Sequence, residues 1–369
     1  MQKVLIVSEQ SNGFYKKYLT KLINALQRQR VDVALMVGDE NHLKINVPMI
    51  ESREFSYLSN ARDEHRFLEV FKTAKINNIT HIHFCRLFDP QRLYAAIKTA
   101  NIKEDFSISF GVFGLSEYTR RPIYARYMEK LLKIDFVKSV LLHSIGPLIS
   151  KQICCEKGFF QSEKVNFIHD LIYENQKDYN LDPKTAKKLL KLEDKGKIVL
   201  FFGAYFFSKG PDILLQAAQD LDGILDLHFL FIGDTSTASF DFKKENYSKF
   251  TNITFIDEFV EDQTAINYMI ASDLVVLPYR KFYQNNTSGV FVQSCLAKTP
   301  LLVPDISPFK NVLEDYELGF VFKCESVKSL KEQIKIFHES SSELALIKYD
   351  KYVETITSWD TTAKLIVFK

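Results

Sequence analysis

Short apolar runs alternate with amphipathic helical stretches along the whole chain, and this alternation limits the possible folds more than any other feature of the sequence. The runs lack a clean period of two, which is typical of strands buried on both faces. Such strands, separated by helices, form parallel sheets with helices on both sides. The strands predicted in the first half are residues 3–8, 31–37, 80–84, 106–110 and 139–144.

The second half repeats this scheme after residues 175–197, a polar, lysine-rich passage without a predicted strand. Such a passage is typical of a domain boundary, and 369 residues is long for one core. We therefore predict two doubly wound α/β domains, residues 1–175 and 176–356. The strands predicted in the second half are residues 197–203, 227–233, 253–257, 273–278, 300–304 and 319–322.

Composition excludes some classes of protein. A net charge of +2 gives no overall field for nucleic acid, so we expect no nucleic-acid partner and only local anion sites. We find neither a signal-peptide pattern nor an apolar run of membrane-spanning length, and expect a cytoplasmic protein. The five cysteines lack CxxC spacing, which argues against a disulfide framework and against a zinc site.

Doubly wound sheets bind ligands at the carboxyl ends of their strands, so the loops that follow these strands are the candidate binding sites. In residues 201–218, FFGAYFFSKGPDILLQAA, Lys209 lies between an apolar strand and a helix start. Its ammonium is expected close to free backbone N–H groups, where a phosphate would bind. An ordinary solvated lysine in the first helical turn explains the spacing equally well.

A second candidate anion site follows the strand at 273–278. Thr287, Ser288 and Gly289 predict the start of a helix that runs to about Leu296, with a hydroxyl as N-cap and a glycine that lets a ligand approach. Arg280 adds a forked cation just past the strand end. Each feature is common in α/β proteins, and together they indicate one phosphate site.

Two further features of the first half are open to more than one interpretation. We expect His81 and His83 to point to opposite faces of their strand, so that only one approaches its carboxyl end; core packing is the commoner role of such histidines.

Residues 118–138 interleave basic and aromatic side chains, as in a helix on an anionic membrane surface, and an ordinary solvated basic helix fits the pattern equally well.

The order of these segments resembles that of the retaining glycosyltransferases of family 4, which have the GT-B fold. The resemblance runs through VLFFGAYFFSKGPDILLQAA, FLFIGD and SGVFVQSCLAKTPLLVPD in the second half, and SNGFYKKYLTKLINAL in the first. It implies two Rossmann-like domains that face each other across a cleft. The first would bind the acceptor and the second a nucleotide sugar, with the closing helix at 357–369 packed back on the first domain.

The resemblance also implies roles for single residues. Lys209 and Arg280 would be catalytic, because they would stabilise charge on the departing diphosphate. The acceptor side would include Asn12, Gly13 and His83. The residues that would bind the donor are Gly203, Lys209, Asn285, Thr287, Ser288, Gly289 and Gln293.

The chain departs from the family pattern at several positions. Ala204 stands where the family has an arginine, and Asn285 and Gln293 stand where it has two glutamates eight positions apart. Phe110 replaces a histidine expected at a strand end, and Asn311 replaces an acidic residue near the base.

We predict a transferase that moves a sugar with retention from a UDP- or GDP-sugar to a glycan or lipid-linked acceptor in polysaccharide or glycoconjugate biosynthesis. No resident cofactor and no metal are expected; Asp220 and Asp222 form the only Asp-x-Asp triplet and precede Gly223 in a predicted helix-ending turn. The segment 118–138 would hold the protein to the inner face of the membrane. The alternative is a catalytically degenerate GT-B protein that serves as a binding or chaperone subunit of a transferase complex.

Overall fold

The chain divides into two compact units. One unit comprises residues 1–174 with 357–369, and the other comprises 175–356. The computed structural model describes residues 2–8, 13–37, 47–48, 65–87, 89–102, 105–169, 179–340 and 349–367.

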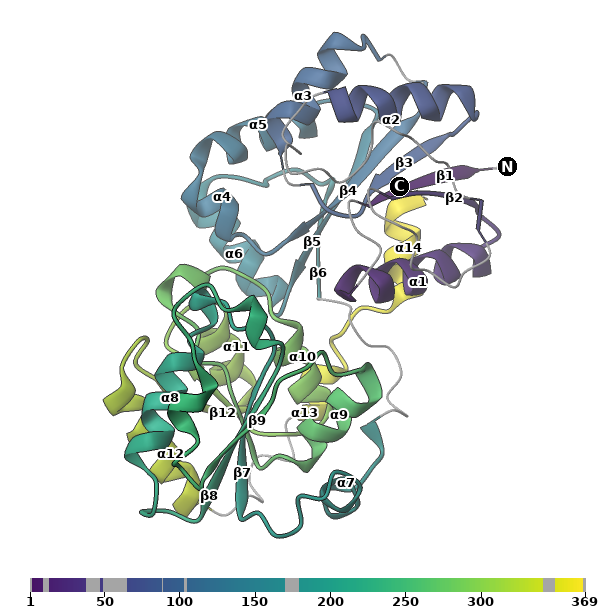
Figure 1. The fold of residues 1–369 in the computed structure, drawn as a ribbon. Coiled ribbons are helices and arrows are strands. Elements are labelled where there is room, and N and C mark those ends of the chain that lie inside the picture. Colours follow the sequence, from purple (N-terminus) through teal and green to yellow (C-terminus); the bar gives the residue numbers. More distant parts are fainter. Residues whose placement is uncertain are drawn as a thin grey trace. The chain divides into compact units, whose positions relative to one another are not determined.

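The first unit is built on a parallel sheet in the order β2-β1-β3-β4-β5-β6 (Figure 1). Its strands are β1 (Lys3–Ser8), β2 (Asp32–Val37), β3 (His81–Phe84), β4 (Ser107–Phe113), β5 (Val137–Ser144) and β6 (Val165–His169). Its helices are α1 (Gly13–Arg28), α2 (His65–Ile76), α3 (Pro90–Thr99), α4 (Ser116–Arg120), α5 (Pro122–Leu132), α6 (Pro147–Lys157) and α14 (Trp359–Val367).

Alternate strand residues divide the core of this unit into two layers. On one face, Leu5, Ile82 and Val140 pack in one cluster with residues of α2, α3 and α5. On the other face, α14 packs on α1 and β5, with the Trp359 ring 5.2 Å from the Tyr18 ring between centroids. Both faces of the sheet are thereby buried, which explains the continuous apolar runs of its strands.

The second unit repeats the architecture with a parallel sheet in the order β12-β11-β10-β7-β8-β9. Its strands are β7 (Lys197–Phe202), β8 (Leu227–Ile232), β9 (Ile253–Ile256), β10 (Leu274–Val276), β11 (Leu301–Pro304) and β12 (Gly319–Phe322). Its helices include α7 (Pro183–Leu189), α8 (Pro211–Asp220), α9 (Asp262–Ala271), α10 (Gly289–Leu296), α11 (Phe309–Tyr316), α12 (Val327–Glu339) and α13 (Tyr349–Val353).

Two doubly wound parallel sheets confirm the predicted fold class. One local prediction was wrong: the strand predicted at 106–110 continues as β4 to Phe113, because Gly111 and Val112 still pair with β5. Phe110 is therefore a fully buried residue in the middle of a strand, not a residue at a strand end.

Candidate functional site

The carboxyl edge of the second sheet brings together the loops after β7, β8 and β10. Gly203 follows β7 and Gly233 follows β8, and a Cβ added at Gly233 would lie 2.1 Å from the carbonyl oxygen of Gly203. A Cβ at Gly210 would similarly lie 2.1 Å from the carbonyl oxygen of Pro278, after β10. Only glycine permits these backbone approaches, so the three loops form one closely packed surface.

Lys209 ends the short 3-10 helix η3 (Phe207–Lys209) on this surface. Gly210 follows in the left-handed conformation with φ 63°, and Pro211 begins α8. The chain therefore turns between Lys209 and the helix. The Lys209 ammonium stands over the end of β7, because a Cβ at Gly203 would lie 3.0 Å from its Nζ.

Within the described part of the chain, the Lys209 ammonium has neither a hydrogen-bond acceptor nor a carboxylate partner. Burial lowers the pKa of Lys209 to about 8, since removal from water penalises the charged form. The side chain is thus a partly dehydrated cation without a counter-ion among the described residues, which is the property expected of an anion-binding lysine.

The predicted helix start is confirmed at α10. Ser288 is its N-cap, and its hydroxyl accepts a 3.3 Å hydrogen bond from the Phe291 N–H. The Ser288 hydroxyl also lies 2.9 Å from the Tyr279 hydroxyl, which ties the cap to the loop after β10. The N–H groups of Gly289 and Val290 precede the first intrahelical bond and are available to an anion.

Gln293 lies one turn into α10 and only 5% of its surface is exposed. No described residue forms a hydrogen bond with the side-chain amide of Gln293. Its neighbour Ser294, by contrast, is satisfied by the Val290 carbonyl at 2.8 Å. A nearly buried amide without a protein partner indicates a ligand contact, because such a group otherwise bears a desolvation cost.

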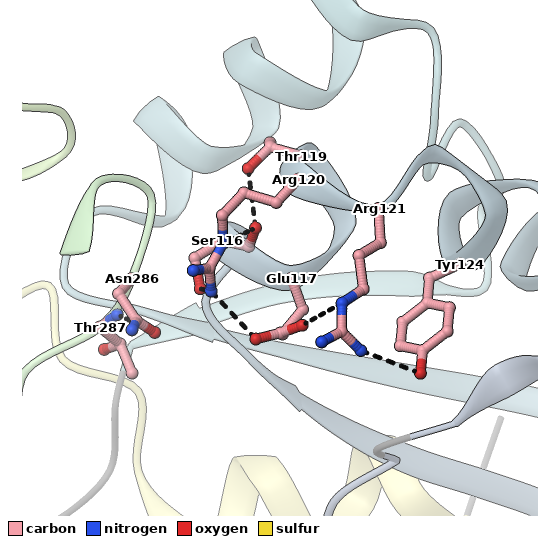
Figure 2. Close-up of polar contacts among 8 residues, drawn as sticks. All are labelled: Ser116, Glu117, Thr119, Arg120, Arg121, Tyr124, Asn286 and Thr287. Atoms are coloured by element: carbon pink, nitrogen blue, oxygen red, sulfur yellow. Dashed lines mark hydrogen bonds and ion pairs between the residues drawn. The ribbon is translucent and has the colours of Figure 1, made fainter. Parts of the chain in front are cut away.

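Asn285 and Thr287 shape the loop that leads into α10. Asn285 adopts the left-handed conformation with φ 61°, and its N–H donates to the Ser307 carbonyl. The Thr287 N–H donates to the Asn286 side-chain oxygen, as Figure 2 shows, and the Thr287 carbonyl accepts from the Tyr283 hydroxyl. These contacts order the loop but leave the ligand roles predicted for Asn285 and Thr287 untested.

The structure argues against the role predicted for Arg280. Its guanidinium forms a bidentate pair with the Asp212 carboxylate, at 2.9 and 2.7 Å, and donates to the Phe207 carbonyl. It also stacks on the Phe207 ring, 3.8 Å from the centroid. The fork expected to hold a phosphate is therefore occupied by protein groups. Sequence reasoning missed Asp212, although its place in the first turn of a helix beside Lys209 was visible.

The two strand histidines of the first unit lie on the same face, so the predicted opposition was wrong: residues two apart in a strand share a face. The Ser109 hydroxyl contacts His81 Nε2 at 2.7 Å and His83 Nδ1 at 2.8 Å. Both histidines are buried, and burial lowers the pKa of His81 to about 3. His83 has no exposed surface, so the expectation that it contacts an acceptor is not supported.

The other acceptor-side residues lie at the start of α1. Gly13 is its first residue, and Asn12 lies outside the described residues. The role predicted for them stays a prediction.

Charged residues gather where β4 leads into α4 and α5, within the segment 118–138 and just before it (Figure 2). The Glu117 carboxylate lies 2.9 Å from the Arg120 guanidinium and 3.4 Å from that of Arg121. Arg121 also donates to the Tyr124 hydroxyl at 3.2 Å. Tyr118 and Leu131 of the expected amphipathic pattern are core residues, because both are buried.

No three His, Cys, Asp or Glu side chains within the described ranges are grouped as a metal site requires. Asp220, from the Asp-x-Asp triplet, ends α8 as predicted and pairs with Lys331. No described helix combines the length and apolar character needed to cross a membrane.

The fold is that of the GT-B glycosyltransferases. Sucrose-phosphate synthase from Thermosynechococcus elongatus superimposes with a TM-score of 0.73 at 16% identity, covering 98% of this chain and 96% of that one. Anabaena Alr3699/HepE, solved in complex with UDP-glucose, gives a TM-score of 0.70 at 14% identity over 99% and 98% of the two chains.

Residues 182–354, which hold the candidate site, match the family Glycosyl transferases group 1. The uncharacterized glycosyltransferase MJ1178 of Methanocaldococcus jannaschii is 25% identical over 217 residues, which is 55% of this chain. The match spans 58% of the length of that curated relative. Both matches are therefore similarities to glycosyltransferases, and the family match lies within the second unit.

Proposed function

We propose that the protein is an enzyme that transfers a sugar from a nucleotide-sugar donor held by the second unit. The observation that carries the proposal is the Lys209 ammonium, which is partly dehydrated, lacks a described counter-ion and stands over the end of β7. The family match to residues 182–354 supports the reaction class, and the UDP-glucose complex of Anabaena HepE supports the donor class.

The residues of the second unit suggest how the donor is handled. Lys209 and the first N–H groups of α10 face the charge that develops on the diphosphate as the sugar leaves, and stabilisation of that charge is the main catalytic requirement. The Gln293 amide can donate to and accept from ribose hydroxyls. Retention of configuration and transfer to a glycan or lipid-linked acceptor at the first unit complete the proposal.

Contact of residues 118–138 with an anionic membrane surface is a further part of this proposal. The exposed side chains of α5 include Arg126 and Lys130, and the Lys130 ammonium lies 4.5 Å from the centroid of the Tyr127 ring. Basic groups beside half-buried aromatic rings suit an interfacial helix. Sedimentation with vesicles of anionic lipid at low and high salt tests this part, and neutral vesicles are the control.

A non-catalytic binding subunit is the second candidate function. It is favoured by Asn285 and Gln293, because neither can supply the carboxylates that the family pattern places there. Turnover of a bound nucleotide sugar separates the enzyme from this candidate, and absence of any nucleotide binding favours the subunit.

Thermal unfolding against a panel of nucleoside diphosphates and nucleotide sugars tests donor binding. Ligand at about 100 times its Kd should add about 2.7 kcal/mol to the stability of the folded state. A shift with one base, reduced in Lys209→Ala but kept in Lys281→Ala, supports the proposal; no shift with any compound contradicts it. Donor hydrolysis or transfer to an added acceptor then separates the enzyme from the binding subunit.

A further inference from the structure

Arg280 contacts the loop after β7 on both sides of Lys209. Before Lys209, the Arg280 N–H donates to the Ser208 carbonyl at 2.9 Å, and the guanidinium donates to the Phe207 carbonyl at 2.9 Å. After Lys209, the same guanidinium holds both carboxylate oxygens of Asp212. The two anchor points lie only a few residues apart in sequence, with Lys209 between them.

Arg280 also belongs to the other half of the candidate site. It directly precedes η6 (Lys281–Tyr283), and the chain continues from there to the Ser288 cap of α10. A rigid planar fork that holds a carboxylate in two places fixes direction as well as distance. The pair is well shielded from solvent on the arginine side, where 12% of the side chain is exposed.

We propose that the Arg280–Asp212 pair is a positioning device: it holds residues 207–212 so that the Lys209 ammonium stands over Gly203, in fixed relation to the start of α10. Arg280 then acts on the donor through Lys209 and does not itself bind phosphate. This inference rests on the proposed function, because it concerns the same diphosphate site.

The surrounding charges agree with this role. The Asp212 carboxylate neutralises Arg280. A second carboxylate, that of Glu325, lies 3.6 Å from the Arg280 guanidinium. Lys209 has no such partner among the described residues, so it is the cation left to meet an anion. A free phosphate at Arg280 would have to displace a bidentate carboxylate, whereas at Lys209 it would displace no group of a described residue.

The variant Asp212→Asn separates positioning from direct binding. If Arg280 bound the diphosphate, loss of the competing carboxylate would leave affinity for nucleoside diphosphate unchanged or raise it. If the pair positions Lys209, the same variant should lower that affinity about 5- to 20-fold, and Arg280→Ala should lower it similarly. Affinity for the nucleoside without phosphate should stay unchanged, and the double variant should be no weaker than Arg280→Ala.

Glu325→Gln is the matched control, because the Glu325 carboxylate faces Arg280 but forms no hydrogen bond or ion pair with the described residues 207–212; it should leave diphosphate affinity within about twofold. Arg280→Lys keeps the charge but lacks the fork, so it should not restore affinity. If Arg280→Ala does not fold, Asp212→Asn still decides the question. If Lys209→Ala lowers diphosphate affinity, unchanged or tighter diphosphate binding by Asp212→Asn would overturn the proposal.

A second measurement does not depend on the donor. Competitive acylation with acetic anhydride, followed across pH by peptide mass spectrometry, reports the titration of the Lys209 amine in the free protein. In the native chain it should titrate near pH 8, and in Asp212→Asn its titration should move upward as the ammonium gains water. If Lys209→Ala leaves nucleotide affinity unchanged while this shift occurs, the proposed function fails and the positioning role survives; no shift contradicts positioning.

Discussion

The Lys209 ammonium and the backbone of Gly203 are direct neighbours, since a Cβ at Gly203 would lie 3.0 Å from Lys209 Nζ. The lysine is thereby held at the carboxyl end of a central strand, where parallel sheets bind ligands. Its ammonium also loses its proton at a lower pH than an exposed lysine does, because burial lowers the pKa of Lys209 to about 8.

Donor affinity should therefore fall as the pH rises through about 8. Lys209 is charged below this pH and neutral above it, so affinity for a nucleotide sugar should fall up to about tenfold per pH unit above 8. Isothermal titration calorimetry between pH 7 and 9.5 measures this. Lys209→Arg is the control, because its guanidinium stays charged in this range. Any change of affinity with pH in this variant is caused by titration of the ligand. Equal slopes in both proteins would contradict the assignment.

Gln293→Leu should weaken donor binding without weakening the fold. The amide has no described protein partner, so an apolar side chain of similar size removes no hydrogen bond from the free protein. The melting temperature should stay equal or rise, while nucleoside diphosphate affinity should drop about tenfold through lost ribose contacts. Ser294→Ala removes a neighbouring buried hydroxyl from the same helix and should leave affinity unchanged. A Gln293→Leu variant with native affinity would exclude this contact.

Gly210→Ala should destabilise the second unit far more than Gly223→Ala. Both glycines have positive φ, 63° and 69°, but an alanine Cβ at Gly210 would meet the Pro278 carbonyl at 2.1 Å, whereas Gly223 has no atom within 4 Å. We expect a cost of about 1 kcal/mol at Gly223 from backbone strain and about 3 kcal/mol at Gly210, where the loop after β10 must also move. Urea unfolding compares the two, and equal costs would refute the close approach.

The first unit should lose stability below about pH 6.5. Burial lowers the pKa of His143 to about 3, and its Nδ1 is buried without a described partner. The unfolded state therefore takes up the proton first, and stability falls by about 1.4 kcal/mol per pH unit for this group as the pH drops. His143→Phe should reduce the slope by that amount.

The fluorescence of Trp359, the only tryptophan, reports unfolding of this unit in urea at each pH. Phe113→Leu is the matched control. It removes the ring stacked on His143, 4.3 Å between centroids, but no titrating group, so its cost should be equal at every pH. A slope unchanged in His143→Phe would mean that this imidazole does not titrate in the unfolding equilibrium.

Much of the architecture could be predicted from local patterns. Continuous apolar runs such as residues 227–232 indicate strands covered on both faces, and helices between them require parallel connections. Ser288 before Gly289 marks the start of α10 because the hydroxyl must accept from the first turn, a contact set by residues three apart. Such signals depend on neighbours in the chain and therefore survive without the tertiary structure.

The roles of single charged and polar side chains were decided by tertiary structure. Arg280 and Asp212 lie 68 positions apart, and only the packing of β10 beside β7 makes them partners. His143 lies beside Phe113 for a similar reason, through pairing of β5 with β4. A sequence states which side chains carry charge, but whether a charge is neutralised depends on distant residues. That is why a doubly wound fold and the start of α10 could be predicted, whereas only the folded chain shows that Arg280 is paired and that Lys209 has no partner among the described residues.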